Sequence, residues 1–226
     1  MRMKANDRVF VVDLSERAFL AEITEVLEDQ VVLRFLSWQE SETELPIRIA
    51  IASGLPKGDK LDFIVQKGTE LGAVAFYPFK AERSVTKWEP KKTAKKIERL
   101  ERIAKEAAEQ SHRTHIPKIE FASDLGKLLT LMEAFDYVVC AYEESSRAGE
   151  KNVLATVFEE IPHGASLLVI FGPEGGLSET EVEQFGKKDV HFAGLGPRIL
   201  RTETAPLYLL AAASYHFELA DSFFNE

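Results

Sequence analysis

The sequence is poor in the residues that build covalently linked or metal-stabilised folds. It holds one cysteine, Cys140, among 226 residues, so no internal disulfide can form. That cysteine falls in the apolar run 137–142, where a core strand residue is expected. The five histidines include His112 and His115, but no further cysteine or histidine lies at a ligand spacing. We therefore expect no metal site.

Long apolar runs are also missing. No stretch reaches the roughly 20 apolar residues that a membrane-spanning helix needs, and the amino terminus lacks a signal-peptide pattern. We therefore expect a cytoplasmic protein with no membrane partner. With 45% hydrophobic residues, the chain can still bury one large core and one small one.

A surplus of basic charge is absent from the chain as a whole, whose formal net charge is -9. The charge is uneven, because residues 51–120 hold 15 basic and 10 acidic side chains, against 6 and 10 in residues 1–50 and 7 and 17 in residues 121–226. This basic stretch is where contact with RNA phosphates is expected, with Trp88 available for stacking. For most individual lysines, however, the solvated face of an amphipathic helix over 90–111 is the preferred interpretation. The basic side chains are Lys80, Arg83, Lys87, Lys91, Lys92, Lys95, Lys96, Arg99, Arg102, Lys105 and Arg113.

Two regions of different pattern follow one another along the chain. Residues 7–36 alternate in the manner of short β-strands separated by acidic turns, and a polar linker ending at Pro46 follows. Beyond it, apolar runs alternate with helical segments, which is typical of an α/β domain with a largely parallel sheet and helices on both faces. We predict a small β domain over residues 1–45 and the α/β domain over residues 46–226. The apolar runs are 47–52, 73–77, 137–142, 167–171 and 190–193.

A glycine loop, Gly172–Gly176, lies at the carboxyl end of the expected strand 166–171. Ser178 and Glu181 then form a capping-box pattern for a helix that ends near Gly186. A strand, glycine loop and helix in this order often bind phosphate, but the loop matches neither a dinucleotide fingerprint nor a P-loop. Its carboxylate, Glu174, is also unsuited to a pyrophosphate. A cofactor with a positive centre and no phosphate, such as S-adenosylmethionine, fits better, although an ordinary turn explains this loop alone equally well.

A second glycine loop, Leu195–Thr204, follows the next expected strand. Ile199 and Leu200 are apolar residues in an irregular segment, where they can wall an adenine ring while backbone groups read its edge. Thr202 or Thr204 is expected to cap a helix with Pro206 in its first turn. Two such loops at neighbouring strand ends predict one ligand pocket. The apolar positions expected on this helix, facing the sheet or a second subunit, are Leu207, Leu210, Ala211, Ser214 and Tyr215.

Five segments together resemble the RsmE family of 16S ribosomal RNA (uracil-N3)-methyltransferases, which belongs to the SPOUT class of S-adenosylmethionine-dependent enzymes with a trefoil knot. The segments occur in order and with matching spacing over most of the carboxyl-terminal three-quarters of the chain. They are Gln66–Gly72, Glu82–Ser84, Glu106–Arg113, Gly172–Gly176 and Leu195–Thr204. The resemblance implies a knotted α/β domain, which general connection rules do not predict, a small amino-terminal PUA/OB-like β-barrel domain that binds RNA, and a homodimer.

The resemblance further implies methylation of N3 of a uridine in 16S ribosomal RNA within the small ribosomal subunit. We assign Arg201 the catalytic role of a cation that stabilises the deprotonated uridine, although a structural pairing with Glu203 is the alternative. Arg2, Lys67, Arg83 and Arg113 are expected to contact RNA, and Arg83 or Arg113 could complete the site of a partner subunit. The residues expected to bind the cofactor are Phe171, Gly172, Pro173, Glu174, Gly175, Gly176, Leu195, Gly196, Ile199, Leu200, Arg201, Thr202 and Thr204.

The chain departs from the family pattern at its amino terminus. It starts where the family's first strand-bearing segment would be ending, so the barrel is expected to lack its first strand, with Arg2 as the remnant of that segment. Two other interpretations stay open, namely a SPOUT methyltransferase for another RNA position and a non-catalytic RNA-binding or ribosome assembly factor. The sequence does not identify a general base. Glu174 and Glu203 are possible, but both are better explained as residues that shape the loops.

Overall fold

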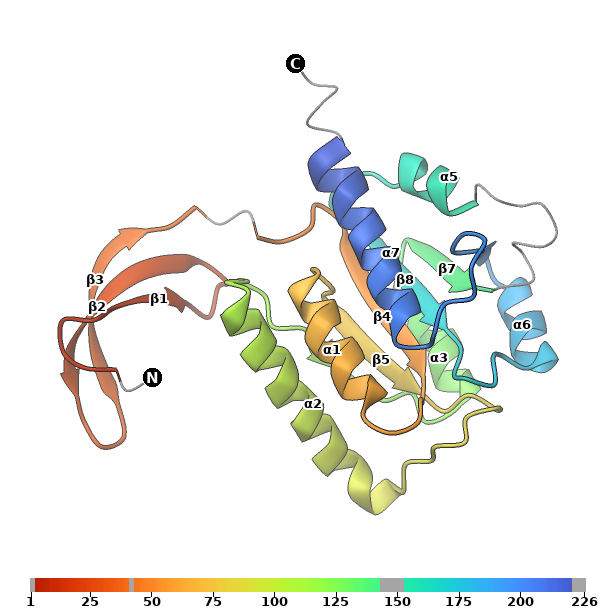
Figure 1. The fold of residues 1–226 in the computed structure, drawn as a ribbon, viewed down its shortest axis with the longest axis horizontal. Coiled ribbons are helices and arrows are strands. Elements are labelled where there is room, and N and C mark those ends of the chain that lie inside the picture. Colours follow the sequence, from red (N-terminus) through yellow and green to blue (C-terminus); the bar gives the residue numbers. More distant parts are fainter. Residues whose placement is uncertain (1–2, 41–42, 143–152, 221–226) are drawn as a thin grey trace. The chain divides into compact units, whose positions relative to one another are not determined.

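A computed structural model of the protein describes residues 3–40, 43–142 and 153–220 (Figure 1). The chain divides into two compact units. The first unit takes a short piece from the middle of the sequence in addition to the amino-terminal region. The units comprise residues 1–44 with 112–115, and residues 45–111 with 116–226.

The first unit is a three-stranded antiparallel sheet of order β1-β2-β3. The predicted short strands are confirmed as β1 (Arg8–Val12), β2 (Ala18–Val26) and β3 (Val31–Trp38). Alternation along β2 turns Ala21 and Ile23 to the covered side, and both are fully buried. Among the described residues no pairing of β1 with β3 closes the sheet into a barrel.

The second unit is built on a six-stranded sheet of order β6-β5-β4-β8-β7-β9, in which all the described neighbours are parallel. The predicted largely parallel sheet is therefore confirmed, with each predicted strand found within two residues of its expected ends. The two-residue strand β6 was not predicted, because so short a segment carries no periodic pattern. The strands are β4 (Arg48–Gly54), β5 (Ala75–Phe79), β6 (Lys118–Ile119), β7 (Tyr137–Ala141), β8 (Ser166–Phe171) and β9 (His191–Ala193).

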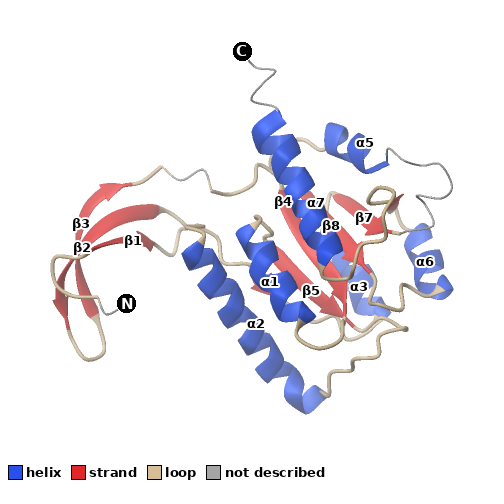
Figure 2. Cartoon of the chain, viewed as in Figure 1, coloured by secondary structure: helices blue, strands red, loops and turns tan. Residues whose placement is uncertain are grey.

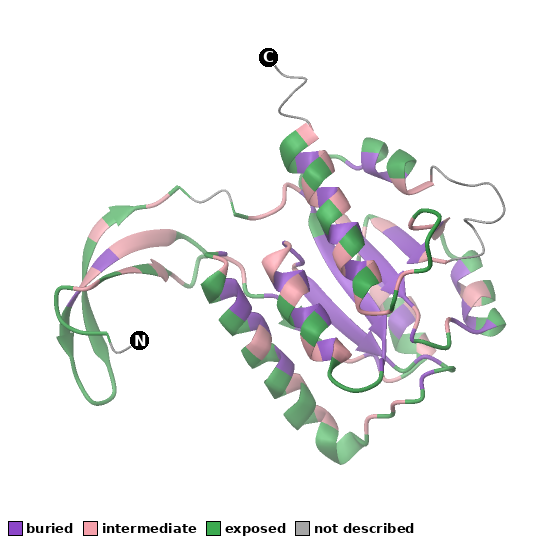
Figure 3. Cartoon of the chain, in the orientation of Figure 1, coloured by how far each residue is buried: buried purple, intermediate pink, exposed green. Residues whose placement is uncertain are grey.

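Helices cover both faces of this sheet, as predicted (Figure 3). Because successive strand residues point to opposite faces, Ile49 and Ile51 of β4 enter one hydrophobic core whereas Ala50 and Ala52 enter the other. Cys140 of β7 is fully buried in the second core, as expected, and this burial raises the pKa of its thiol. The described helices on the first core are α1 (Lys60–Glu70), α2 (Pro90–Gln110), α5 (Val153–Glu160) and α7 (Thr204–Ser214), and those on the second are α3 (Leu125–Met132) and α6 (Glu179–Gly186).

Helix α2 is amphipathic, which confirms the pattern predicted over residues 90–111. It buries one stripe, formed by Leu100, Ala104, Ala107 and Ala108, and leaves its lysines and arginines exposed. Most of the basic side chains in the middle of the sequence therefore lie on a solvated helix face.

The start of α7 differs from the prediction. The residue that precedes the helix is Glu203, and it forms no side-chain cap, so the predicted capping by Thr202 or Thr204 is wrong. The chain turns at Arg201 instead, whose carbonyl oxygen accepts hydrogen bonds from the amides of Thr204 and Ala205 at 2.9 and 3.0 Å. A backbone carbonyl of the loop, and not a threonine hydroxyl, thus accepts the hydrogen bonds of the first helix amides.

The buried face of α7 also differs from the prediction. The helix buries Pro206, Leu209, Leu210 and Ala213, of which only Leu210 was expected. Apolar residues occur on all sides of this helix, so periodicity alone does not select a face. A π-helical turn, η1 (Tyr215–Ala220), follows directly after α7. None of the helices in the described ranges is long and apolar enough to cross a membrane.

Candidate functional site

The two glycine loops follow β8 and β9, at the carboxyl-terminal edge of the sheet in the second unit. The prediction that these two strands are neighbours is wrong, because β7 lies between them. In the parallel register, Ala141 of β7 lies beside Phe171 of β8 on one side and beside Ala193 of β9 on the other. Three strands therefore end together, next to the point where the chain order reverses between β4 and β8. In α/β sheets this crevice at the carboxyl ends of the strands is the usual place for a ligand.

The two loops line a single cavity of about 590 Å³. Every residue expected to bind the cofactor contributes to its wall, with one exception. Thr204 does not, because it stands exposed at the first position of α7. The residues that the cavity brings together are Phe171, Gly172, Pro173, Glu174, Gly175, Gly176, Leu195, Gly196, Ile199, Leu200, Arg201 and Thr202.

The first loop is a tight turn held against a neighbouring segment. The amide of Gly176 donates to the carbonyl oxygen of Pro173 at 2.8 Å, and Gly176 has a φ of 70° that favours glycine. A Cβ atom on Gly175 would lie 3.0 Å from the carbonyl oxygen of Arg83. The absence of a side chain at Gly175 thus lets the segment after β5 pack directly on the loop.

The predicted capping box fixes the helix that follows this loop. The Ser178 hydroxyl accepts from the Glu181 amide at 3.2 Å, and the Glu181 carboxylate accepts from the Ser178 amide at 2.8 Å. The second carboxylate oxygen of Glu181 accepts from the Glu82 amide at 2.9 Å. This buried carboxylate therefore connects the start of α6 with the segment that carries Arg83.

The second loop provides the apolar part of the cavity wall. Ile199 is 77% exposed although it lines the cavity, and Leu195 and Leu200 beside it are half-buried. Exposed apolar side chains on a cavity wall offer contact area to an apolar ring system, while nearby backbone groups provide hydrogen bonds.

Lys60, the first residue of α1, bridges the two loops. Its Nζ lies 2.9 Å from Oε1 of Glu174 in the first loop and 3.1 Å from Oε2 of Glu203 in the second. The backbone amide of Lys57 also donates to Glu174 at 3.1 Å. Sequence reasoning missed Lys60, since nothing local to residue 60 indicates carboxylates more than 100 positions away.

The bridge favours the ionised form of both carboxylates. Desolvation raises the pKa of Glu174, but the hydrogen bonds from Lys60, from its own backbone and from Lys57 outweigh it, so the pKa lies below its usual value. A hydrogen bond from its own backbone, together with Lys60, likewise lowers the pKa of Glu203. The expectation that Arg201 could pair with Glu203 is not met, since the ion-pair partner of Glu203 among the described residues is Lys60.

Three arginines give the cavity a basic rim. Arg83, Arg198 and Arg201 all line it and are exposed. Arg83 comes from the segment after β5, whereas the other two come from the second loop. With Glu174 engaged by Lys60, this side of the cavity is suited to a polyanion such as RNA.

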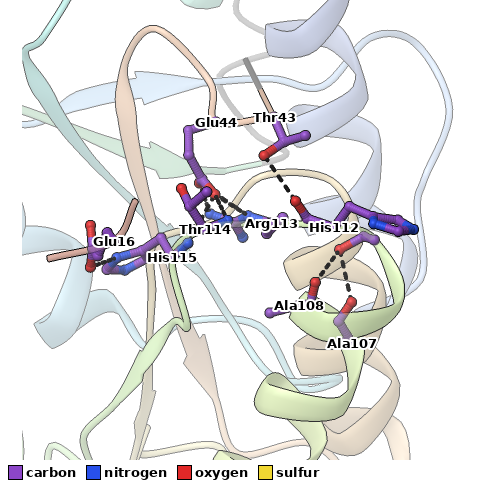
Figure 4. Close-up of polar contacts among 10 residues, drawn as sticks. Glu16, Thr43, Glu44, Ala107, Ala108, His112, Arg113, Thr114 and His115 are labelled. Carbon is purple, nitrogen blue, oxygen red and sulfur yellow. Dashed lines mark hydrogen bonds and ion pairs between the residues drawn. The ribbon is translucent and has the colours of Figure 1, made fainter. Parts of the chain in front are cut away.

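The other residues expected to contact RNA lie elsewhere. Lys67 pairs with Glu70 at 2.7 Å on α1 and does not line the cavity. Arg113, in the first unit, is buried, and its Nε donates to the Glu44 carboxylate oxygens at 3.1 and 3.2 Å (Figure 4). A phosphate could reach this guanidinium only if that pair opened. Arg2 lies outside the described residues.

The parallel sheet and the cavity at its carboxyl edge fit a methyltransferase that acts on RNA, and comparison with known proteins supports this class. A family model described as RNA methyltransferase domain matches residues 43–214. Ribosomal RNA small subunit methyltransferase E of Bacillus subtilis is 51% identical over 219 residues, which cover 97% of this chain and 86% of the relative. The chain therefore belongs to the RNA methyltransferase family and, within it, to the RsmE group that the five motifs resemble.

Solved structures agree with this assignment. A crystal structure of a protein described as hypothetical is 49% identical, with a TM-score of 0.90 over 96% of this chain and 86% of that chain. A ribosomal RNA small subunit methyltransferase E from Neisseria gonorrhoeae, crystallised with bound S-adenosyl methionine, is 28% identical. Its TM-score is 0.78, over 94% of this chain and 84% of that chain.

Proposed function

We propose that the protein transfers a methyl group from S-adenosylmethionine to N3 of a uridine in 16S ribosomal RNA, within the small ribosomal subunit. The observation that carries the proposal is that two glycine loops, which follow β8 and β9 on either side of β7, line one cavity with a basic rim. The names of the related proteins and the S-adenosyl methionine bound to the Neisseria enzyme support it. Action on ribosomal RNA would place the protein in the cytoplasm.

The residues of the cavity fit such a methyl donor. Ile199, Leu195 and Leu200 offer an apolar wall for an adenine ring, and the glycines of both loops expose backbone groups to its edge. A volume of about 590 Å³ is ample for a compound of this size. When bound, the donor supplies a methyl group on a positively charged sulfur.

Arg201 is the residue to which we assign the electrostatic part of the reaction. N3 of uridine carries a proton, and when that proton leaves, negative charge spreads to the flanking carbonyl oxygens. A guanidinium beside one of these oxygens stabilises the anion and lowers the pKa of the imide. N3 then bonds to the methyl carbon as the carbon–sulfur bond breaks, leaving a neutral thioether, and the cavity contributes mainly by alignment.

Glu174 and Glu203 fit the role of loop-shaping residues better than that of a general base. Both are engaged by Lys60, and both have a lowered pKa, which makes them weak proton acceptors. N3 lies on the pairing edge of the base, so the target uridine must be unpaired or drawn out of its stack before it reaches the cavity.

We propose that the two units have different tasks. Residues 1–45 would form the RNA-binding β domain, which is PUA/OB-like. Arg2 of this domain and Arg113 of the first unit would contact the RNA. Residues 46–226 would form the SPOUT methyltransferase domain, where Lys67 and Arg83 would contact RNA. The exposed aromatic side chains Phe10, Phe35 and Trp38 of the first unit offer stacking surface for bases.

We further propose that the second unit is knotted. β9 stands at one edge of the sheet beyond β7, yet α7 packs in the core beside α1. The chain must therefore return across the ends of β7 and β8, where the first glycine loop projects. Threading of the second loop through that region would produce the trefoil knot of the SPOUT class.

We also propose a homodimer, for which α7 and η1 offer a contact surface. Tyr208 is 40% exposed, Tyr215 is 63% exposed and Leu219 is 54% exposed, although all three are large and apolar. Tyr208 lies in α7, and Tyr215 and Leu219 lie in η1, which follows it directly. Spacings of seven and four residues place the three along one side, away from the buried Leu209 and Ala213. A second copy would cover this stripe.

The experiment that tests the function is methyl transfer to small ribosomal subunits that lack the modification. With S-adenosylmethionine labelled in its methyl group, we expect label in 16S ribosomal RNA at N3 of one uridine. Label on another base or another atom would identify a different RNA methyltransferase. Binding of S-adenosylmethionine without any transfer would favour the non-catalytic interpretation.

A further inference from the structure

A second cavity, of about 700 Å³, lies in the same unit and shares no lining residue with the first. Its wall contains Trp88, at the end of the segment between β5 and α2, and Phe121, just after β6. Their ring centroids are 4.8 Å apart with an angle of 30° between the planes. Both rings are only half-buried, and Nζ of Lys96 lies over the Trp88 ring, 5.4 Å from its centroid. A base that stacks on Trp88 would therefore take the place of this lysine.

Lysines surround this aromatic pair. Lys80, Lys87 and Lys127 line the cavity and are exposed, and no ion pair occupies any of them among the described residues. The one acidic side chain on the wall, Glu120, is paired with Lys118 at 2.5 Å. The cavity therefore combines aromatic rings with exposed lysine side chains that form no ion pair among the described residues.

The segment between β5 and α2, drawn as a loop in Figure 2, contributes residues to both cavities. Residues 80–88 place Arg83 in the first cavity and Lys80, Lys87 and Trp88 in the second. Arg83 and Lys87 are four residues apart, which even in extended chain is at most about 14 Å. The segment is held in place, since the Thr86 hydroxyl donates to the carbonyl oxygen of Pro56 at 2.8 Å and the Glu82 amide donates to Glu181.

We propose that this second cavity binds an unpaired nucleotide of the RNA substrate close to the target uridine, with the base on Trp88 and Phe121 and the phosphates on Lys80, Lys87 and Lys127. Aromatic faces with lysines around them are the combination that single-stranded RNA requires, because every base has a stacking face and every nucleotide a phosphate. The inference rests on the proposed function, since it gives the same RNA a second point of attachment. An acidic protein segment is the competing occupant, because it would use the lysines without needing the rings.

The two tryptophans of the chain allow a direct test. In the Trp38→Phe variant, Trp88 is the only tryptophan, so its fluorescence reports on this cavity. We expect saturable quenching when single-stranded oligouridylate is added, and no comparable change with oligoglutamate of equal charge. Quenching by oligoglutamate alone would assign the cavity to a protein partner, and the absence of any saturable change would overturn the proposal.

Matched lysine variants separate this cavity from general charge effects. In the Trp38→Phe background, Lys80→Ala with Lys127→Ala removes two phosphate contacts. The slope of the logarithm of the oligouridylate binding constant against the logarithm of the salt concentration should become shallower by about 1.4, since each contact contributes ~0.7. Lys187→Ala with Lys188→Ala changes the net charge equally but lies outside the cavity, so it should change little. Phe121→Leu should weaken binding about 5- to 150-fold, the range measured for loss of one stacked base. Equal effects of the two lysine pairs would contradict a localised site.

Methyl transfer to small subunits distinguishes failure of this inference from failure of the proposed function. If wild-type protein methylates the subunits, Lys80→Ala with Lys127→Ala should raise the KM for the subunits and leave the KM for S-adenosylmethionine unchanged. An unchanged KM for the subunits would refute the second cavity and leave the function intact. If wild-type protein transfers no methyl group, the function fails, and the fluorescence titration still decides what the cavity binds.

Discussion

Arg201 is the residue on which the proposed chemistry depends most. Its side chain lines the cavity, while its carbonyl oxygen holds the turn into α7. Arg201→Ala removes the side chain and keeps the carbonyl, so the loop should persist. We expect kcat for methyl transfer to fall about 100- to 1000-fold, as for other preorganised donors to a developing anion, with little change in the Kd of S-adenosylmethionine. Single-turnover transfer and calorimetry measure the two quantities, and unchanged transfer would remove Arg201 from the mechanism.

Lys60 is a second single residue on which the cavity depends, because it joins the two glycine loops through Glu174 and Glu203. Lys60→Met keeps the length of the side chain and removes its charge, so the two loops lose their common cation. We expect the Kd of S-adenosylmethionine to rise roughly two- to fivefold, as solvent screening keeps such bridges weak. Lys60→Arg should restore part of the affinity. Lys57→Met is the matched control, because Lys57 contacts Glu174 through its backbone amide only.

The bridge also predicts a pH dependence. Because the pKa values of Glu174 and Glu203 are lowered in the folded protein, the bridge is complete at neutral pH. Its contribution is lost as the pH falls below the usual range of glutamate and through these lowered values. Affinity for S-adenosylmethionine, measured by calorimetry over an acidic pH series, should therefore fall less steeply in Lys60→Met than in the wild type. Parallel curves would show that the bridge does not shape the cavity.

At the scale of elements, the end of β4 supports the first glycine loop by close packing. A Cβ atom on Gly54 would lie 2.6 Å from Cδ of Pro173 and 2.8 Å from its backbone nitrogen. Gly54→Ala should therefore displace the loop and cost about 1–3 kcal/mol of stability, which corresponds to roughly 2–12 °C in Tm for a chain of this size. The Kd of S-adenosylmethionine should rise at the same time.

The control for this substitution is Gly186→Ala, at the last residue of α6. No atom lies within 4 Å of the position that its Cβ would take, and its φ is negative. Thermal unfolding should show an unchanged or slightly raised Tm, because alanine favours helices. Equal losses in both variants would mean that contact with Pro173 is not what makes Gly54 necessary.

At the scale of the whole molecule, the ion pair of Glu44 and Arg113 holds together sequence segments nearly 70 positions apart. The Arg113 side chain is 2% exposed, and Glu44 also accepts from the amides of Thr114 and His115 at 3.0 and 3.1 Å (Figure 4). Glu44→Leu leaves a buried guanidinium without its carboxylate and should lower the free energy of unfolding of the first unit by about 3 kcal/mol. Urea unfolding measures this loss when Trp88→Phe is added to each protein, so that the fluorescence comes from Trp38 in the first unit.

The double variant Glu44→Leu with Arg113→Met provides the decisive comparison. Replacing both charges with apolar side chains removes the unpaired cation, so the double variant should be more stable than Glu44→Leu alone. Desolvation raises the pKa of Glu44, but Arg113 and the two backbone amides outweigh it, and the pKa is lowered. The stabilisation by the Glu44–Arg113 pair should therefore be complete at neutral pH and disappear in acid. The double variant, which lacks the pair, should not show this loss.

The proposed dimer is also tested at this scale. Tyr215→Glu places a charge in the exposed stripe of α7 and η1 without touching the buried side, and it should convert a dimer into monomers in analytical ultracentrifugation. Glu218→Gln, at an exposed position outside the stripe, is the control and should leave the assembly unchanged. A wild-type protein that is monomeric and fully active would refute the dimer.

Local patterns in the sequence determined the elements and the loops of this protein. The apolar runs predicted the strands, Ser178 and Glu181 predicted the start of α6, and the two glycine loops predicted a pocket that the structure shows as one cavity. These features depend on neighbours in the chain, so periodicity and capping chemistry suffice. The five sequence motifs were likewise enough to identify the family.

The tertiary structure alone decided which distant residues meet. It brought Lys60 to Glu174 and Glu203, turned Arg113 to Glu44 and chose the buried face of α7. Such contacts arise when strands pair and helices pack, and a lysine or an arginine looks the same in the sequence whichever carboxylate it later meets. Burial then fixes the partner, because a buried charge must be neutralised by whatever the fold places beside it.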